Sequence, residues 1–173
     1  YIQKTYLNDA PIDYLEFGVF RGESIDHWTK IHAHRESRFF GFDSFEGLPE
    51  DWFMKGKKGL FDTHGKVPAM ADPRCQFVKG LFQETLPTFI NEMSDQRRLV
   101  IHNDSDLYSS TLFCLTKLDA ILASGSIIIF DEFNVADHEF RAFIDYTRSH
   151  RRAYSVIGGS GARSVEQVAV IME

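Results

Sequence analysis

Carboxylates that follow two neighbouring apolar stretches are the residues of this chain best suited to bind a metal ion. Asp104 comes directly after one stretch, and Asp131 and Glu132 come directly after the next. Carboxylates brought together repel one another unless a cation neutralises them, and ligand sets made only of oxygen favour magnesium, calcium or manganese over zinc. The three residues predict a hard divalent metal site; the alternative is that some of them cap helices.

A glycine turn and an aspartate nearer the N-terminus predict that the chain binds a nucleoside cofactor. Gly18 permits a sharp turn, Gly22 permits close approach of a ligand, and Glu16 can accept hydrogen bonds from an ammonium group. Asp43 closes the next apolar stretch and can accept hydrogen bonds from ribose hydroxyls. The alternatives are an ordinary turn and an aspartate that caps a turn with Ser44. The glycine spacing is not GxGxxG, which disfavours a nicotinamide cofactor.

Strand and helix patterns alternate along the chain and must position these residues. Short apolar or β-branched runs predict strands over 12–17, 38–42, 75–79, 99–103 and 126–130. Helical spacing predicts helices over 24–33, 83–93, 111–122 and 133–149. Ser24 is the expected N-cap of the first helix, and Gly125 is expected to end the third. Two closing strands, 154–157 and 167–172, predict an antiparallel hairpin with its turn at 158–161.

This alternation predicts an α/β fold, a Rossmann-like three-layer α/β/α sandwich with a mostly parallel seven-stranded sheet and a C-terminal antiparallel hairpin. With 173 residues, 43% hydrophobic content and 16 phenylalanines, the chain can form one core, so we expect a single domain over 1–173. The segment 54–72 is rich in lysine and glycine and lacks an apolar period. It predicts a lid loop, with disorder as the alternative.

Composition and charge limit the partners and the compartment. The net charge of -6 and the absence of a basic run disfavour nucleic acid. Cys75 and Cys114 form no CxxC pair and no signal peptide begins the sequence, so a cytoplasmic protein without disulfides or structural zinc is expected. No apolar run approaches the roughly 20 residues that a membrane span needs. The phenylalanines at 133, 140 and 143 exceed what one core needs and favour a homodimer.

Four stretches together resemble the macrocin O-methyltransferase (TylF/MycF) family. They are 15–24, 41–49, 104–111 and 128–133, and the most specific parts are 42–49 and then 106–111. The resemblance extends over nearly the whole chain. It implies a class I methyltransferase fold that uses S-adenosylmethionine and magnesium to methylate a hydroxyl of a sugar or another natural product.

Carried over by position, the resemblance implies a role for each site residue. Asp43 would hold the ribose, Gly80 and Phe82 would lie near the adenine, and the three carboxylates named first would bind the metal. The full set of implied cofactor-binding residues is Glu16, Gly18, Phe20, Gly22, Ser24, Asp43, Ser44, Phe45, Gly80, Phe82 and Asp104. The chain departs from the family in having Asp131-Glu132 where an Asp-Asp pair is usual, and in lacking the N-terminal helices that often cover the acceptor.

The mechanism that follows is direct displacement, in which an acceptor hydroxyl oxygen attacks the methyl group in line. Asp104 and the metal would orient the acceptor, and Asp106 or His138 would take the proton. For His138 the alternative is an ordinary surface residue. Two other protein classes stay open. A non-catalytic cofactor-binding protein would not need the carboxylates, and a metal-dependent nucleotide hydrolase would need a phosphate cradle, yet no Walker-type loop is present.

Overall fold

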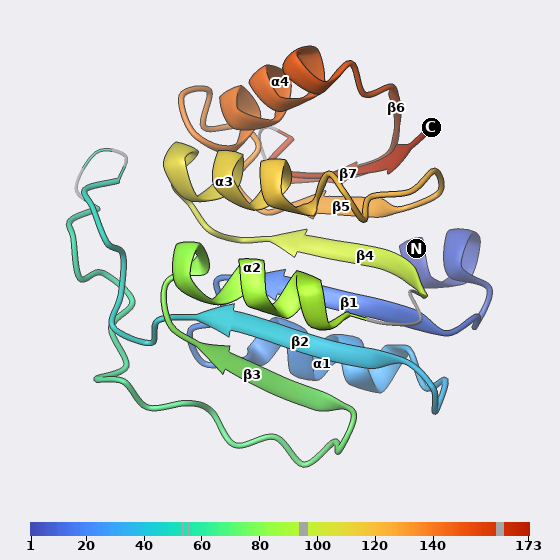
Figure 1. Cartoon of the computed structure of the whole chain (residues 1–173), viewed down its shortest axis with the longest axis horizontal. Helices are drawn as coiled ribbons and strands as arrows, with labels where there is room; N and C mark the ends of the chain where they lie inside the picture. The colour runs from blue at the N-terminus through green and yellow to red at the C-terminus, as the bar shows by residue number, and fades with distance from the viewer. Residues whose placement is uncertain (53, 55, 94–96, 162–164) are drawn as a thin grey trace.

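The computed structural model describes residues 1–52, 54, 56–93, 97–161 and 165–173, and in this part of the chain seven strands form one sheet. The strand order is β3-β2-β1-β4-β5-β7-β6 (Figure 1). The parallel strands are β1 (Ile12–Phe17), β2 (Arg38–Asp43), β3 (Cys75–Lys79), β4 (Arg98–Asn103) and β5 (Ile127–Phe130). The antiparallel strands are β6 (Tyr154–Ser160) and β7 (Gln167–Met172). The predicted sheet is confirmed.

Helices cover both faces of this sheet and complete the predicted three layers. One face carries α2 (Phe82–Glu92), α3 (Tyr108–Leu118) and α4 (Glu139–His150), and the other carries α1 (Glu23–Ile31) and the short π-helix η1 (Gln3–Leu7) (Figure 1). Among the described residues, no helix has both the length and the apolar character required to cross a bilayer.

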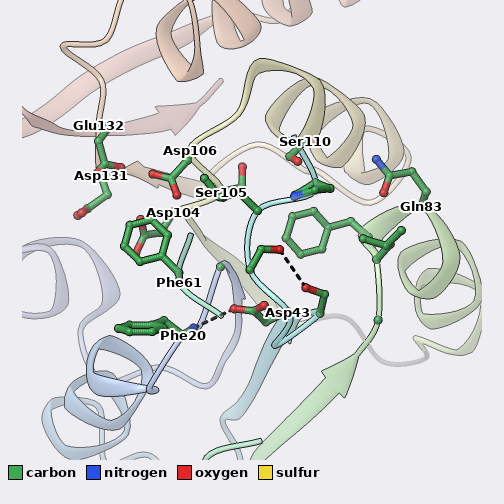
Figure 2. A pocket seen from close by; sticks show the side chains of 18 residues that line it. Phe20, Asp43, Phe61, Gln83, Asp104, Ser105, Asp106, Ser110, Asp131 and Glu132 are labelled. Carbon is green, nitrogen blue, oxygen red and sulfur yellow. Dashed lines mark hydrogen bonds between the residues drawn. The ribbon is translucent and has the colours of Figure 1, made fainter. Parts of the chain in front are cut away.

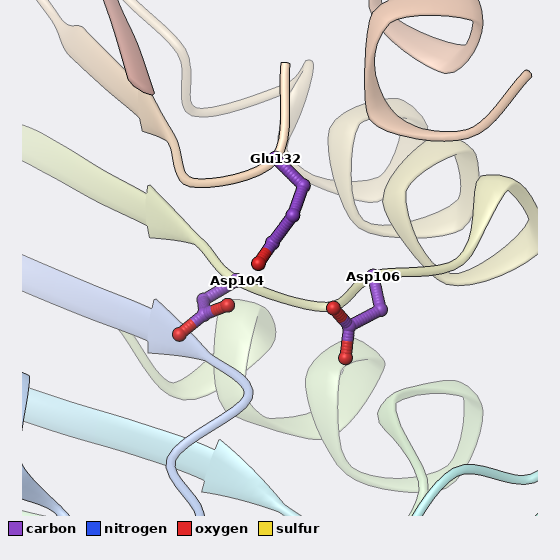
Figure 3. A group of neighbouring side chains, drawn as sticks. All are labelled: Asp104, Asp106 and Glu132. Carbon is purple, nitrogen blue, oxygen red and sulfur yellow. The ribbon is translucent and has the colours of Figure 1, made fainter. Parts of the chain in front are cut away.

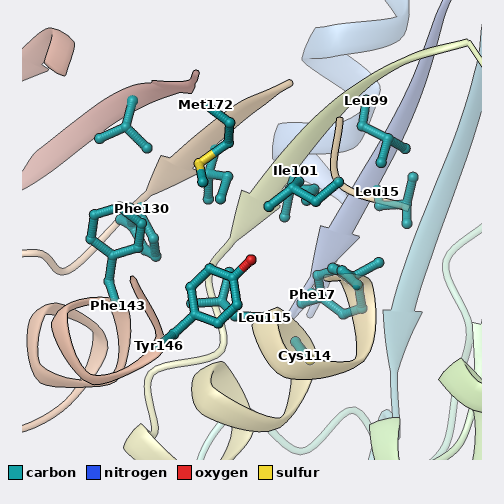
Figure 4. Close-up of a cluster of buried hydrophobic side chains, with 14 of the residues drawn as sticks. Leu15, Phe17, Leu99, Ile101, Cys114, Leu115, Phe130, Phe143, Tyr146 and Met172 are labelled. Atoms are coloured by element: carbon teal, nitrogen blue, oxygen red, sulfur yellow. The ribbon is translucent and has the colours of Figure 1, made fainter. Parts of the chain in front are cut away.

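Both faces of the parallel strands β1, β2, β4 and β5 are largely buried, which explains their apolar composition, whereas the edge strand β3 is partly exposed. In β1, Leu15 and Phe17 point into the larger core under α2, α3 and α4 (Figure 4). Ile12 and Tyr14 point into the smaller core under α1. Successive residues of a strand face opposite sides of the sheet, and full burial of each large apolar side chain contributes about 1.5–3 kcal/mol. These two cores fix the orientation of every strand end that carries a site residue.

Several predicted boundaries are wrong, including the start of the third helix, which lies at Tyr108 and not at 111, and at three of them a tertiary contact accounts for the difference. Helix α3 ends at Leu118, where the carboxylate of Asp119 accepts a hydrogen bond from Arg152 Nε at 2.7 Å, so Gly125 lies in a later turn and does not cap the helix. Helix α4 starts at Glu139, not at 133, since the chain first pairs with the hairpin through the Phe133 N–H. Strand β6 continues to Ser160, and its glycines pair with β7 in place of the predicted turn at 158–161.

The phenylalanines that favoured a homodimer divide between core and surface. Phe143 is fully buried in the larger core, and Phe133 packs partly buried against it, with ring centroids 6.1 Å apart. Phe140 is 40% exposed and meets Phe133 edge to face. The core therefore uses most of this aromatic surface, and the homodimer stays a prediction.

The long connection between β2 and β3 runs past the carboxyl ends of the strands, on the left in Figure 1. Beyond its midpoint it is anchored to the residues that follow β2, because the Gly65 N–H donates to the Phe45 carbonyl at 2.7 Å. At its far end the guanidinium of Arg74 donates to the carbonyls of Thr29, His32 and His34. The predicted lid, 54–72, is thus tied down on both sides; its position 55 lies outside the described residues.

Candidate functional site

A cavity of about 250 Å³ opens at the carboxyl ends of the five parallel strands (Figure 2). Open α/β sheets bind their ligands at this edge. The predicted site residues that line it are Gly18, Phe20, Asp43, Ser44, Gly80, Phe82, Asp104, Asp106, Asp131 and Glu132. The predicted residues that do not line it are Glu16, Gly22, Ser24, Phe45 and His138. The structure thus brings predicted site residues from the end of each of the five parallel strands together around one cavity.

Gly18 makes the turn at which three strand ends meet. Its φ is +90°, and a Cβ built on it would lie 1.8 Å from the carbonyl oxygen of Asp104. The close approach that the glycines provide is therefore between two segments of this chain. Gly22, with φ +79°, is the N-cap of α1, so the prediction that Ser24 caps this helix is wrong. A glycine takes this left-handed conformation without the steric cost of a side chain.

Asp43 organises the backbone on one side of the cavity. Its Oδ2 accepts hydrogen bonds from the N–H groups of Phe20 at 2.9 Å (Figure 2) and Val19 at 2.8 Å, and its Oδ1 accepts one from Phe45 at 2.7 Å. The turn-capping alternative is therefore present in the geometry. A carboxylate offers about four lone-pair sites, of which three are used here. Asp43 retains one acceptor site for a hydroxyl of a ligand in the cavity.

Three carboxylates converge on the opposite side of the cavity. One oxygen each of Asp104, Asp106 and Glu132 lies within 4.8 Å of the other two (Figure 3). Burial, together with repulsion from the neighbouring carboxylates, raises the pKa of Asp104 and of Asp106 to about 7 and that of Glu132 to about 8. Glu132 Oε2 is buried without a hydrogen-bond partner. The group thus holds unpaired acceptor capacity and a charge repulsion that a cation would relieve.

Asp131 lines the same cavity but points to a different set of partners. Its Oδ1 accepts a hydrogen bond from Gln167 Nε2 and lies 3.8 Å from His102 Nε2. The nearby His102 imidazole lowers the pKa of the Asp131 carboxyl. Asp106 takes the place in the carboxylate group that the sequence analysis assigned to Asp131.

Glu16 and Ser24 belong to a buried polar network behind the glycine turn. Glu16 Oε1 accepts a hydrogen bond from Ser24 Oγ at 2.7 Å, and Oε2 accepts one from the Tyr14 hydroxyl at 2.6 Å. His102 Nδ1 lies 2.8 Å from the same hydroxyl. Burial lowers the pKa of His102, but Asp131 and Glu16 outweigh it and raise the pKa to about 10. Sequence reasoning missed His102, although a histidine inside a buried strand was a signal for it.

Glu139 is a second residue that sequence reasoning missed. It is fully buried. Its Oε1 accepts a hydrogen bond from Asn103 Nδ2 at 2.8 Å, and its Oε2 accepts one from the backbone N–H of Glu132 at 3.2 Å. Burial raises its pKa well above the usual range. Glu139 therefore supports Glu132 from behind, whereas its neighbour His138 occupies the N-cap position of α4 outside the cavity wall.

The strand order, the glycine turn after β1 and the acidic residue that ends β2 define a class I methyltransferase fold. The solved O-methyltransferase NovP shares this fold, with a TM-score of 0.71 at 24% identity over 97% of this chain and 74% of NovP. The methyltransferase PaMTH1 of Podospora anserina, solved with S-adenosylhomocysteine, has a TM-score of 0.58 at 14% identity over 99% of this chain and 76% of its own.

The chain belongs to the macrocin-O-methyltransferase (TylF) family, whose model matches residues 61–157, more than half of its length. A relative from Streptomyces olivaceus, 8-demethyl-8-(2,3-dimethoxy-alpha-L-rhamnosyl)-tetracenomycin-C 4'-O-methyltransferase, is 31% identical over 82% of this chain and 62% of its own. The family predicted from the four sequence stretches is thereby confirmed. The chain spans about three fifths of the length of the curated relatives it matches.

Proposed function

We propose that this protein is an S-adenosylmethionine-dependent O-methyltransferase that methylates a hydroxyl of a small molecule, a sugar or another natural product. The observation that carries the proposal is the cavity itself, which has a nucleoside-type wall around Gly18 and Asp43 and a carboxylate wall around Asp104. Membership of the TylF family supports the reaction type. We also propose that residues 1–173 act as a single domain.

The glycine turn and Asp43 would hold the cofactor. When bound, S-adenosylmethionine supplies an activated methyl group on a sulfonium. Asp43 keeps the Val19–Phe20 backbone in place and has one acceptor site left for a ribose hydroxyl. Gly80 and Phe82, at the end of β3 and the start of α2, line the part of the cavity proposed for the adenine. These residues would bind the cofactor and orient its methyl group toward the acceptor. Because the methyl donor is already activated, its alignment with the acceptor is the main requirement of the reaction.

Asp104, Asp106 and Glu132 fit a divalent cation, and magnesium is the ion we propose. The fit rests on hard oxygen donors, on their spacing and on the unpartnered Oε2 of Glu132. When bound, such a cation lowers the pKa of an acceptor hydroxyl. Of the two residues expected to take the proton, only Asp106 lines the cavity, so we assign that role to it.

Calorimetric titration with S-adenosylmethionine and S-adenosylhomocysteine, with and without magnesium, tests the cofactor assignment. We expect affinities of micromolar order, which correspond to about -8 kcal/mol. Absence of binding in every condition would contradict the proposal. A panel of glycosides then tests turnover through S-adenosylhomocysteine release, which a non-catalytic cofactor-binding protein would not show.

Magnesium is expected to raise the thermal stability of the chain through its carboxylate group. At a hundredfold excess over the dissociation constant, a ligand of the native state adds about 2.7 kcal/mol. The variant Glu132→Gln removes one donor charge and should lose most of this stabilisation, whereas the exposed Glu92→Gln should keep it. Thermal unfolding in magnesium and in chelator measures the effect. Equal stabilisation of both variants would refute a cation site at Glu132.

A further inference from the structure

Among the described residues of the long β2–β3 connection, Phe61 is the aromatic residue that lines the cavity. Figure 2 shows its ring beside Phe20 and near Asp104. The Phe20 and Phe61 rings meet edge to face with centroids 5.5 Å apart, and Phe61 is 40% exposed. An apolar surface left open inside a cavity of acidic residues is available for contact with a ligand.

The backbone holds both rings in place at a conformational cost. Phe61 has φ +67° and Phe20 has φ +51°, values in the left-handed region that bulky residues rarely adopt. Such residues cluster at functional sites, where the surroundings over-determine them. Here the Asp43 carboxylate accepts a hydrogen bond from the Phe20 N–H. Next to Phe61, the carbonyl of Leu60 accepts a hydrogen bond from the Leu48 N–H. The two aromatic residues are therefore positioned by contacts on both sides of the cavity.

The surroundings of Phe61 suit an alkylated cation. The guanidinium of Arg21 lies 4.8 Å from the centre of the Phe20 ring, so Phe20 already has a cation against one face. Phe61 has no such partner among the described cation–π contacts. Asp43 and Asp104 line the same cavity and add negative charge. Aromatic faces attract cations, and rings near carboxylates favour alkylated cations over neutral groups of similar shape.

We propose that Phe61 contacts the sulfonium end of bound S-adenosylmethionine, so that the chain binds S-adenosylmethionine more tightly than S-adenosylhomocysteine, which lacks the sulfonium charge. This inference rests on the proposed function, since it assumes that the cavity binds this cofactor. It assigns the 54–72 segment a direct part in choosing substrate over product.

Titration of Phe61→Leu with both ligands tests the role, because leucine keeps an apolar side chain and removes the aromatic face. We expect the affinity for S-adenosylmethionine to fall about three- to fivefold and that for S-adenosylhomocysteine to change less than about twofold. Val67→Ala is the control. Val67 is 43% exposed on the same loop but does not line the cavity, so the affinities of this variant should equal those of the wild type.

The outcomes separate this inference from the proposed function. A wild type that binds both ligands and a Phe61→Leu variant that loses both equally, or neither, would overturn the role of Phe61 and leave the methyltransferase proposal standing. A wild type that binds neither ligand would overturn both. Thermal unfolding of each variant confirms that the comparison is made between folded proteins.

Discussion

Replacing Gly18 with alanine is expected to destabilise the folded protein by about 4 kcal/mol, the upper range for a single substitution. The new methyl group would lie 1.8 Å from the carbonyl oxygen of Asp104. The alanine would also have to keep the φ of +90° that Gly18 adopts. Relief of that clash requires β1 and β4 to separate at their carboxyl ends, where the site is built. Urea denaturation followed by circular dichroism measures the loss.

Gly125→Ala separates the clash from the backbone strain. Gly125 has nearly the same φ, +86°, but a Cβ on it would meet no atom within 4 Å. We expect this variant to lose only about 1–2 kcal/mol, the cost of the left-handed conformation for a residue with a side chain. Equal losses for the two variants would show that the contact between Gly18 and Asp104 does not limit the fold.

Asp43→Ala is expected to weaken the binding of S-adenosylmethionine and S-adenosylhomocysteine by about a hundredfold or more, equivalent to about 2.7 kcal/mol. The substitution removes the acceptor of three backbone hydrogen bonds and the remaining site for a ribose hydroxyl. Hydrogen bonds to a charged group contribute about 1.5–3 kcal/mol each. Calorimetric titration of the variant with both ligands gives the result.

Asp26→Ala is the control for Asp43→Ala. Asp26 is a half-exposed carboxylate on α1 that pairs with Lys30, outside the cavity, and its removal should leave the affinity for both ligands unchanged. Thermal unfolding of Asp43→Ala shows how much of its effect comes from the loosened Val19–Phe20 backbone. Wild-type affinity in a folded Asp43→Ala variant would refute the assignment of Asp43 to the cofactor.

Much of the fold was predictable from the sequence because its strands are short runs of apolar or β-branched residues, most of them buried in the middle of the sheet. Each of the runs 12–17, 75–79 and 167–172 matches an observed strand at both ends. Helix ends were harder to predict. The end of α3 depends on the ion pair between Asp119 and Arg152, and these residues are 33 positions apart in the chain.

The sequence by itself determined which residues stand at the binding edge, because parallel strands place their carboxyl ends together. Gly18 and Asp104 follow strands, Asp43 ends one, and all three line the cavity. Only the tertiary structure decided which carboxylates face one another. His102 and Gln167 come from β4 and β7, and together they orient Asp131 away from the group that Glu132 joins. Side-chain direction depends on such partners from other strands, and local sequence patterns do not specify them.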